Sequence, residues 1–260
     1  MSKHHLTNAT TLTYGEAYNA VAFATNGNRG VPVNLLTKIS LGSPITLDAN
    51  GLMVDATSTE LPNATTKTYT TATDNTTPLD GAIAAPSTVF LNGASVLVWE
   101  LDVPRNITGV VSHSTTTLAM TVTINGYDIY GAPMSETLTF AATATSVSVA
   151  GVKAFKYIYS YVITAAGNAT ANTLNLGWGD VLGMPYKLPA KSDLIQSWFN
   201  EVLEGTVATS VIGDTTTATS TTGDVRGTVD LNSAMNGSAV SVWCRLDPST
   251  EATLFGVVQA

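Results

Sequence analysis

TLAMTVTI, residues 117–124, is the stretch that decides the fold. Leu118, Met120, Val122 and Ile124 occupy every second position, and threonine or alanine fills the positions between them. Because successive side chains of a strand point to opposite faces of its sheet, this alternation predicts a strand with one face in a core and one toward solvent.

The residues after this stretch continue the strand pattern. The Asn125-Gly126 pair predicts a turn, and a second turn is expected at residues 131–133. Leu138 and Phe140 then alternate with threonines. Two consecutive hairpins of this kind predict a meander.

An aromatic stripe marks a further strand. Phe155, Tyr157, Tyr159, Tyr161 and Ile163 recur at strand spacing, which places them together on one predicted face. Such a stripe can stack on carbohydrate rings or bases. Packing in a core or against neighbouring strands is the interpretation we favour.

Glycine-rich turns are expected around this strand. After a short strand at residues 172–176, the sequence Gly177-Trp178-Gly179-Asp180 predicts a tight turn, and we expect positive φ angles at Gly131 and Gly179. Residues 191–205 fit a helix face, but their surroundings are β, and we favour a strand.

The N-terminal third has a weaker pattern. A hairpin is predicted in which Ile45 and Leu47 on one side, and Leu52 and Val54 on the other, flank a turn at residues 48–51. Residues 57–88, rich in Thr, Asn, Pro and Ala, predict a long loop.

The first 35 residues predict an extended arm. Tyr14, Tyr18, Val21 and Phe23 are spaced through small and polar residues, too few to form a core of their own. We therefore expect these four side chains to bind a partner chain.

Further alternation at residues 225–231 and 240–246 completes the pattern. The sequence predicts an all-β protein, a β-sandwich or jelly-roll-like domain with an extended N-terminal arm and a smaller C-terminal β unit. The expected divisions are 1–89 for the arm and accessory hairpin, 90–188 for the main β domain and 189–260 for the C-terminal unit.

Composition excludes several classes of function. Charged residues make up 12% of the chain and hydrophobic residues 44%, with a net charge of -8 and a mean hydropathy of +0.20. Scattered basic residues argue against a nucleic-acid groove, and no apolar run is long enough to span a membrane. So few charges favour a surface that partners cover.

Chemistry-bearing residues are sparse. The three histidines are His4, His5 and His113, and no serine lies in a GxSxG motif. Glu100 and Asp102 are interpreted as solvated charges beside Arg105.

Asp180, Asp214 and Asp224 lack the alternating oxygen ligands of a calcium loop, and the single Cys244, interpreted as a buried small hydrophobe, forms no cysteine cluster. We predict no catalytic residues, no cofactor and no metal, and therefore a non-enzymatic protein.

Four segments in the middle of the chain carry turn-and-strand motifs: Val122–Gly131, Met134–Leu138, Val149–Lys156 and Gly177–Tyr186. In these segments the chain resembles virion structural proteins of tailed bacteriophages. Residues 216–219 and 223–227 are similar to the same group, whereas Trp178 stands where a small or polar residue is expected.

The resemblance implies a capsid decoration (cement) protein. Such a protein would bind the major capsid protein on the head exterior as a homo-oligomer, a trimer by analogy, with no nucleic-acid or membrane partner. Its location would be the virion, after assembly in the host cytoplasm. A tail or neck component, and a cell-surface adhesin that binds carbohydrate, remain alternatives.

Overall fold

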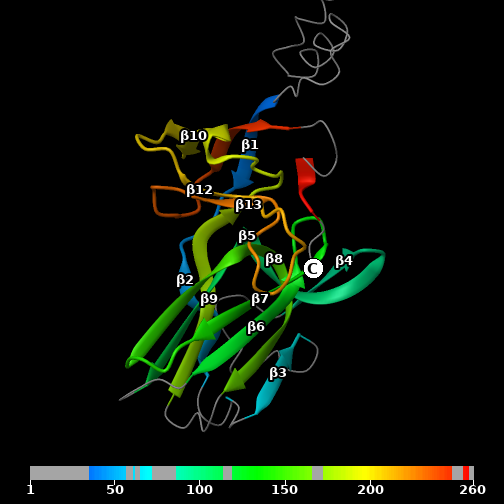
Figure 1. The fold of residues 1–260 in the computed structure, drawn as a ribbon, viewed down its shortest axis with the longest axis vertical. Helices are drawn as coiled ribbons and strands as arrows, with labels where there is room; N and C mark the ends of the chain where they lie inside the picture. Colours follow the sequence, from blue (N-terminus) through cyan, green and yellow to red (C-terminus); the bar gives the residue numbers. More distant parts are fainter. Residues whose placement is uncertain are drawn as a thin grey trace, which may run out of the picture.

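The computed structural model describes residues 35–56, 61, 65–71, 86–113, 119–165, 172–247 and 254–257. Within them the regular structure is almost entirely antiparallel β-sheet, which confirms the expected all-β, sandwich-like fold (Figure 1). The strands are β1 (Leu35–Gly42), β2 (Asp48–Ala56), β3 (Thr66–Thr70), β4 (Ser87–Leu91), β5 (Ala94–His113), β6 (Met120–Tyr127), β7 (Pro133–Phe140), β8 (Ser146–Ala165), β9 (Asn172–Gly183), β10 (Leu194–Phe199), β11 (Val202–Leu203), β12 (Thr209–Ile212), β13 (Gly227–Asp230) and β14 (Val240–Leu246). A short 3-10 turn, η2 (Lys191–Asp193), precedes β10.

The strands form two sheets of unequal size. The large sheet has ten strands in the order β12-β13-β9-β5-β8-β6-β7, with β2 paired to β9, β3 to β8 and β4 to β5. The small sheet has four, in the order β1-β14-β10-β11. Figure 1 shows the small sheet at one end of the molecule's long axis and β3 at the other.

Each sheet buries one hydrophobic cluster. The larger cluster lies within the curled large sheet and includes Ile124, Phe140, Phe155 and Trp178. The second lies where the small sheet packs on the end of the large one, and it joins Ile39, Val103, Leu182 and Val242. The second cluster is therefore a core that both sheets share, and it is built from distant parts of the chain.

From Met120 onward the decisive stretch behaves as predicted, whereas residues 117 and 118 lie outside the described residues. Strand β6 alternates strictly between buried and half-buried positions, with Met120, Val122 and Ile124 buried. The turn expected at Asn125-Gly126 is wrong, because the strand continues to Tyr127. Gly126 is needed for another reason: a Cβ there would lie 2.1 Å from the carbonyl oxygen of Tyr157.

The aromatic stripe on β8 is divided between two faces. The pairing of β6 with β8 shifts register between Asn125 and Gly126, so that Tyr159 has no partner there. Tyr161 and Phe155 are fully buried, whereas Tyr159 is half-buried and packs on Tyr127 with ring centroids 5.3 Å apart. The single-face prediction is wrong, because an extra residue in a strand reverses the alternation beyond it.

The glycine turn predicted at residues 177–180 is wrong, because these residues lie within β9. Gly131 has the expected positive φ of 78°, but Gly179 has no positive φ. A Cβ on Gly179 would instead lie 2.5 Å from the side-chain oxygen of Asn106. Close packing between β9 and β5 is therefore what requires the glycine.

The hairpin predicted around residues 48–51 is also wrong. Those residues form the start of β2, which pairs with β9, whereas β1 pairs with β14 in the other sheet. The loop expected at residues 57–88 contains β3, paired with β8. The strand favoured within residues 191–205 is confirmed as the β10–β11 hairpin.

Candidate docking surface

The small sheet has one face in the core and an opposite face whose side chains are exposed or half-buried, including the half-buried Trp198 and Trp243. Ile39, Val242 and Cys244 point inward to the second cluster. Because side chains alternate along a strand, their neighbours point outward. The outward positions, which we call the outer face, are Leu36, Lys38 and Ser40 on β1, Ser241, Trp243 and Arg245 on β14, Gln196 and Trp198 on β10, and Leu203 on β11.

Cross-strand register brings the outer-face side chains into rows. Lys38 lies opposite Trp243, and Leu36 lies opposite Arg245. Trp198 lies between Ser241 and Leu203 in the next row. Directly opposed residues in antiparallel strands have Cβ atoms about 5 Å apart. The outer face thus combines two indole rings with aliphatic and basic side chains.

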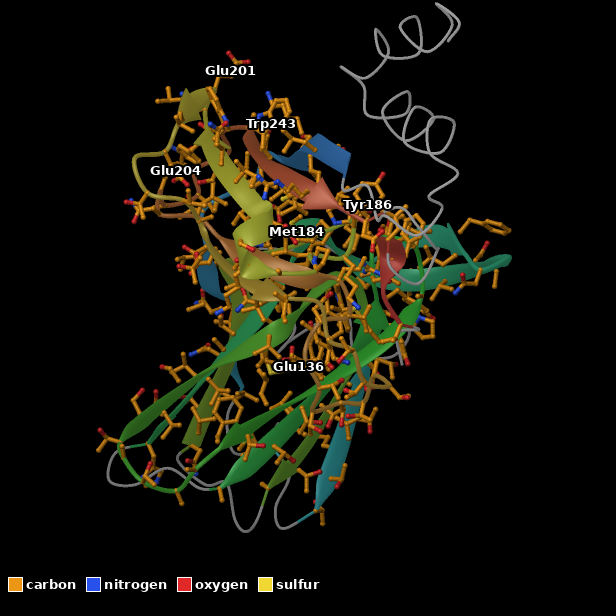
Figure 2. All side chains as sticks on the ribbon, turned by 45° about the horizontal axis from the view of Figure 1, so that its top comes forward. Glu136, Met184, Tyr186, Glu201, Glu204 and Trp243 are labelled. Carbon is orange, nitrogen blue, oxygen red and sulfur yellow. The ribbon has the colours of Figure 1, made fainter. Side chains whose placement is uncertain are left out.

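The outer face is basic in an acidic protein. Its nine positions include Lys38 and Arg245 and no acidic residue, although the chain carries a net charge of -8. Both side chains are exposed, and neither forms an ion pair within the part of the chain that the structure describes. Acidic residues come next to this face along the chain: Glu201 lies in the β10–β11 turn, and Glu204 follows Leu203 (Figure 2).

Local backbone geometry holds the hairpin that carries Trp198. Asn200 and Glu201 both have positive φ angles, 50° and 63°, as required by a two-residue hairpin turn of this hand. The side chain of Glu204 accepts a hydrogen bond from the Ser233 amide at 2.8 Å. These contacts fix β11 beside β10 and keep Leu203 against Trp198.

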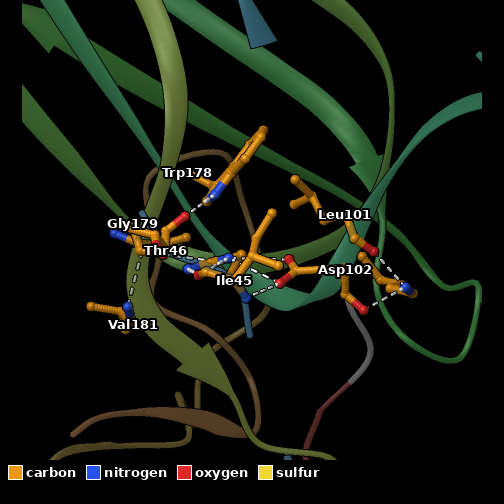
Figure 3. A network of polar contacts seen from close by, with 10 residues as sticks. Ile45, Thr46, Leu101, Asp102, Trp178, Gly179 and Val181 are labelled. Atoms are coloured by element: carbon orange, nitrogen blue, oxygen red, sulfur yellow. Dashed lines mark hydrogen bonds and ion pairs between the residues drawn. The ribbon is translucent and has the colours of Figure 1, made fainter. Parts of the chain in front are cut away.

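Arg105 ties the large sheet to the segment between β1 and β2 (Figure 3). Its guanidinium donates to the carbonyl oxygens of Gly179 at 2.7 Å and Ile45 at 3.2 Å, and pairs with Asp102 at 3.1 Å. Ile45 lies in the segment that connects β1 to β2. The side chain is completely buried, and this desolvation lowers the pKa of Arg105 despite Asp102.

The loop at residues 213–226 is held on the large sheet by a second buried polar group. The Lys153 ammonium donates to the Thr219 carbonyl at 2.8 Å, and the Thr137 amide donates to the Ser220 carbonyl at 2.7 Å. The Asp224 carboxylate accepts from the Ala154 amide at 3.1 Å. This loop therefore covers part of β7 and β8.

Glu136 lies beside these contacts in β7. Its carboxylate accepts from the amides of Val152 and Lys153, and only 4% of the residue is exposed. Burial, partly offset by these hydrogen bonds and by the Lys153 charge, raises the pKa of Glu136 to about 7. Burial also lowers the pKa of Lys153 and raises that of Asp224.

Arg226 completes the attachment of the loop. It pairs with the buried Asp128 at 2.9 Å and donates to the Met184 carbonyl at 3.1 Å. Asp128 in turn accepts from the Tyr130 and Ala132 amides and so shapes the turn after β6. Buried charges in this region thus serve as internal attachments.

The residues predicted to bind a partner, Tyr14, Tyr18, Val21 and Phe23, lie outside the described residues. The structure does not bring the candidate catalytic groups together: His113 lies opposite Asn172 at the start of β9, whereas Asp180 lies near the end of that strand. Asp102 pairs with Arg105, and Glu100 pairs with Lys156 at 3.0 Å.

The remaining candidates have structural surroundings. Cys244 is confirmed as buried, and burial raises the pKa of its thiol to about 12. Asp214 accepts from Thr216 and Gly223 within its own loop. Among the described residues, no three His, Cys, Asp or Glu side chains form a group able to hold a metal ion. No helix in the described ranges is long and apolar enough to cross a membrane.

Sequence reasoning missed both the outer face and the buried charges. The signal available in the sequence was the alternation of inward and outward positions along each strand. Glu136 shares its face with Leu138 and Phe140, and is therefore core-facing, whereas Trp243 falls between the buried Val242 and Cys244 and is therefore outward.

Comparison of the chain with protein-family models, with curated proteins and with solved structures finds no match.

Proposed function

We propose that this chain is a non-enzymatic structural protein of a tailed-phage virion, a decoration protein that binds the exterior of the head lattice and stabilises it. The observation that carries the proposal is the outer face of the small sheet, where Trp198 and Trp243 lie on the side away from the core. Tryptophan is enriched at the centres of protein interfaces, because a large ring buries much apolar area with little loss of conformational freedom.

The basic residues of the outer face indicate the kind of partner surface that would bind to it. Lys38 and Arg245 flank Trp243, so a complementary partner presents carboxylates around an apolar centre. A phosphate backbone would require a larger cluster of basic residues than these two. The proposed partner is accordingly a protein lattice, the major capsid protein, and not packaged DNA.

The predicted arm belongs to the same proposal. The described chain begins at Leu35 in β1, the edge strand of the small sheet, and the predicted arm precedes this strand in the sequence. Each of the four arm anchors would contribute about 1.5 to 3 kcal/mol if fully buried on a partner. Assembly as a homotrimer follows from analogy with decoration proteins at three-fold lattice positions.

The test is binding of the purified protein to phage heads that lack it, measured by co-sedimentation. We expect Trp243→Ala, and the pair Lys38→Glu with Arg245→Glu, to lower affinity at least tenfold. Lys67→Glu is the control for charge reversal at a single lysine, since it makes the Lys38→Glu change on β3 at the far end of the molecule (Figure 1). Wild-type protein that does not bind heads, or Trp243→Ala that binds as tightly as wild type, would defeat the proposal.

Two further measurements separate the alternatives. Deleting residues 1–34 should leave the melting temperature unchanged and lower occupancy on heads. Binding to purified tails in place of heads would support the tail or neck alternative. Turnover of nucleotides, esters or glycans that is lost on His113→Ala or Asp180→Ala would contradict a non-enzymatic role.

A further inference from the structure

A two-stranded ribbon projects from the large sheet. Strand β4 pairs only with the first residues of β5 among the described strands, through a turn at Asn92-Gly93 with φ angles of 51° and 82°. The outer edge of β4 therefore has no partner strand within the described chain. Residues 86–99 include no charged side chain. Exposed edges usually carry charges that prevent pairing, and an isolated ribbon is only marginally stable in water.

Phe90 is the most exposed large hydrophobic side chain among the described residues, at 74%. It lies in β4 opposite Ser95. An exposed aromatic ring on an uncharged ribbon gains free energy only when another surface covers it. This ring is therefore a candidate for insertion into a partner.

An apolar groove lies beside the turn that follows β6, to which Ile129 belongs. Its volume is about 340 Å³, and Leu41, Val103, Pro104, Ile129 and Pro185 supply most of its apolar lining. A phenyl ring fits this space, since an apolar cavity of about 150 Å³ is enough to bind benzene. The ring of Phe90 does not occupy the groove of its own molecule, because it remains 74% exposed.

The groove suits an uncharged occupant. Its charged lining residues, Asp102 and Lys156, are already paired with Arg105 at 3.1 Å and with Glu100 at 3.0 Å. An uncharged ribbon inserted there leaves both ion pairs intact, whereas a charged segment would compete with them. The electrostatics of groove and ribbon are thus complementary.

We infer that Phe90 of one copy inserts into this groove of a second copy. The ribbon tip and the groove share one turn, because the Asn92 side chain donates to the Gly131 carbonyl and Ile129 lines the groove. Each copy presents a ring to one neighbour and receives a ring from another, a heterologous contact that forms a closed assembly when the rotation between copies closes. This contact would lie within the homo-oligomer. Only the number of copies in that oligomer rests on the proposed function.

Light scattering on a sizing column tests the association. Phe90→Ser, and separately Ile129→Asp, should weaken self-association at least tenfold without changing the melting temperature. Val211→Ser is the control: Val211 is 51% exposed on β12, away from the ribbon and groove, and its loss should change neither quantity. A wild-type protein that is monomeric, or a Phe90→Ser protein that associates as wild type does, overturns the inference.

Disulfide trapping tests the contact itself. Cys244 is fully buried and serves as a silent background thiol. A mixture of the Phe90→Cys and Ile129→Cys proteins, treated with an oxidant, should yield the mixed dimer on a non-reducing gel. Phe90→Cys mixed with Val211→Cys should not.

The two proposals fail in different ways. Absence of the mixed dimer, with head binding retained, overturns this contact and leaves the proposed function standing. A mixed dimer from a protein that does not bind heads supports this contact and removes the proposed function.

Discussion

Arg105, Glu136 and Lys153 lie inside the large sheet, whereas Lys38 and Arg245 are exposed on the outer face of the small sheet. In the large sheet the buried charges bind carbonyl and amide groups of neighbouring segments. In the small sheet the exposed charges flank a tryptophan. Because several of the few charged residues are buried, the surface carries even fewer charges than the composition suggests. The basic side chains that remain on the surface are therefore informative.

The largest test of this contrast compares two tryptophans. Trp178 is 2% exposed in the large core, and its indole donates to the Thr46 carbonyl at 3.1 Å. Trp178→Ala should lower the free energy of unfolding by about 3 to 5 kcal/mol, as expected for a buried aromatic side chain. Trp243→Ala should cost about 1 kcal/mol. Urea denaturation measures both, and equal losses would show that Trp243 belongs to the core.

Arg105→Met tests the buried ion pair next. The substitution leaves Asp102 and the carbonyl oxygens of Ile45 and Gly179 without their shared donor. Breaking a buried pair by removing one partner costs about 3 to 5 kcal/mol, and the Asp102 side chain is 21% exposed, so we expect the lower end of that range. Lys191→Met, at an exposed position, should change the unfolding free energy by less than about 0.5 kcal/mol.

Glu136 makes the stability of the large sheet depend on pH. Its pKa is about 7 in the folded protein and near 4.5 in the unfolded chain, so the folded state retains a proton that the unfolded state releases between these values. Stability therefore falls as pH rises from about 4.5 to about 7, by on the order of 3 kcal/mol. Glu136→Gln should remove most of this slope in urea titrations at several pH values. An unchanged slope would assign the pH dependence to other groups.

Gly177→Ala adds a single methyl group and tests the packing of β2 on β9. A Cβ at this position would lie 1.7 Å from the carbonyl oxygen of Asp48, so β2 must move away from β9. We expect a loss of about 1 to 3 kcal/mol from overpacking. Gly205→Ala is the matched control, because nothing lies within 4 Å of its added Cβ. Equal melting temperatures for the two variants would show that β2 is held loosely.

The alternation of apolar and polar residues predicted the strands that keep a strict period of two. It failed where an extra residue in a strand interrupts that period. Strands β6 and β14 keep a strict period of two, and their buried residues follow directly from the sequence. In β8 the register shift moves Tyr159 off the core, and no local pattern marks that shift. The pairing of β1 with β14 joins residues about 200 positions apart, which composition and turn signals cannot reveal.

The candidate site was only partly accessible to sequence reasoning. The low charge content indicated that a partner covers part of the surface. It did not indicate which part, because that depends on the strand register that turns Trp198 and Trp243 outward. Glycines were read as turn residues, whereas Gly126, Gly177 and Gly179 allow strands to approach closely. A glycine within an apolar run carries the same letter in either role, so packing alone distinguishes them.

Strands β5 and β8 are each 20 residues long and pair antiparallel along much of their length. Hydrogen bonds between such strands lie perpendicular to the strand direction. A pull along these strands therefore loads the bonds between them in shear, so many must stretch together before any pair separates. A pull across the sheet opens them one at a time. The molecule is consequently stiff in one direction and compliant in another, and the angle at which it is attached determines how much tension it can bear.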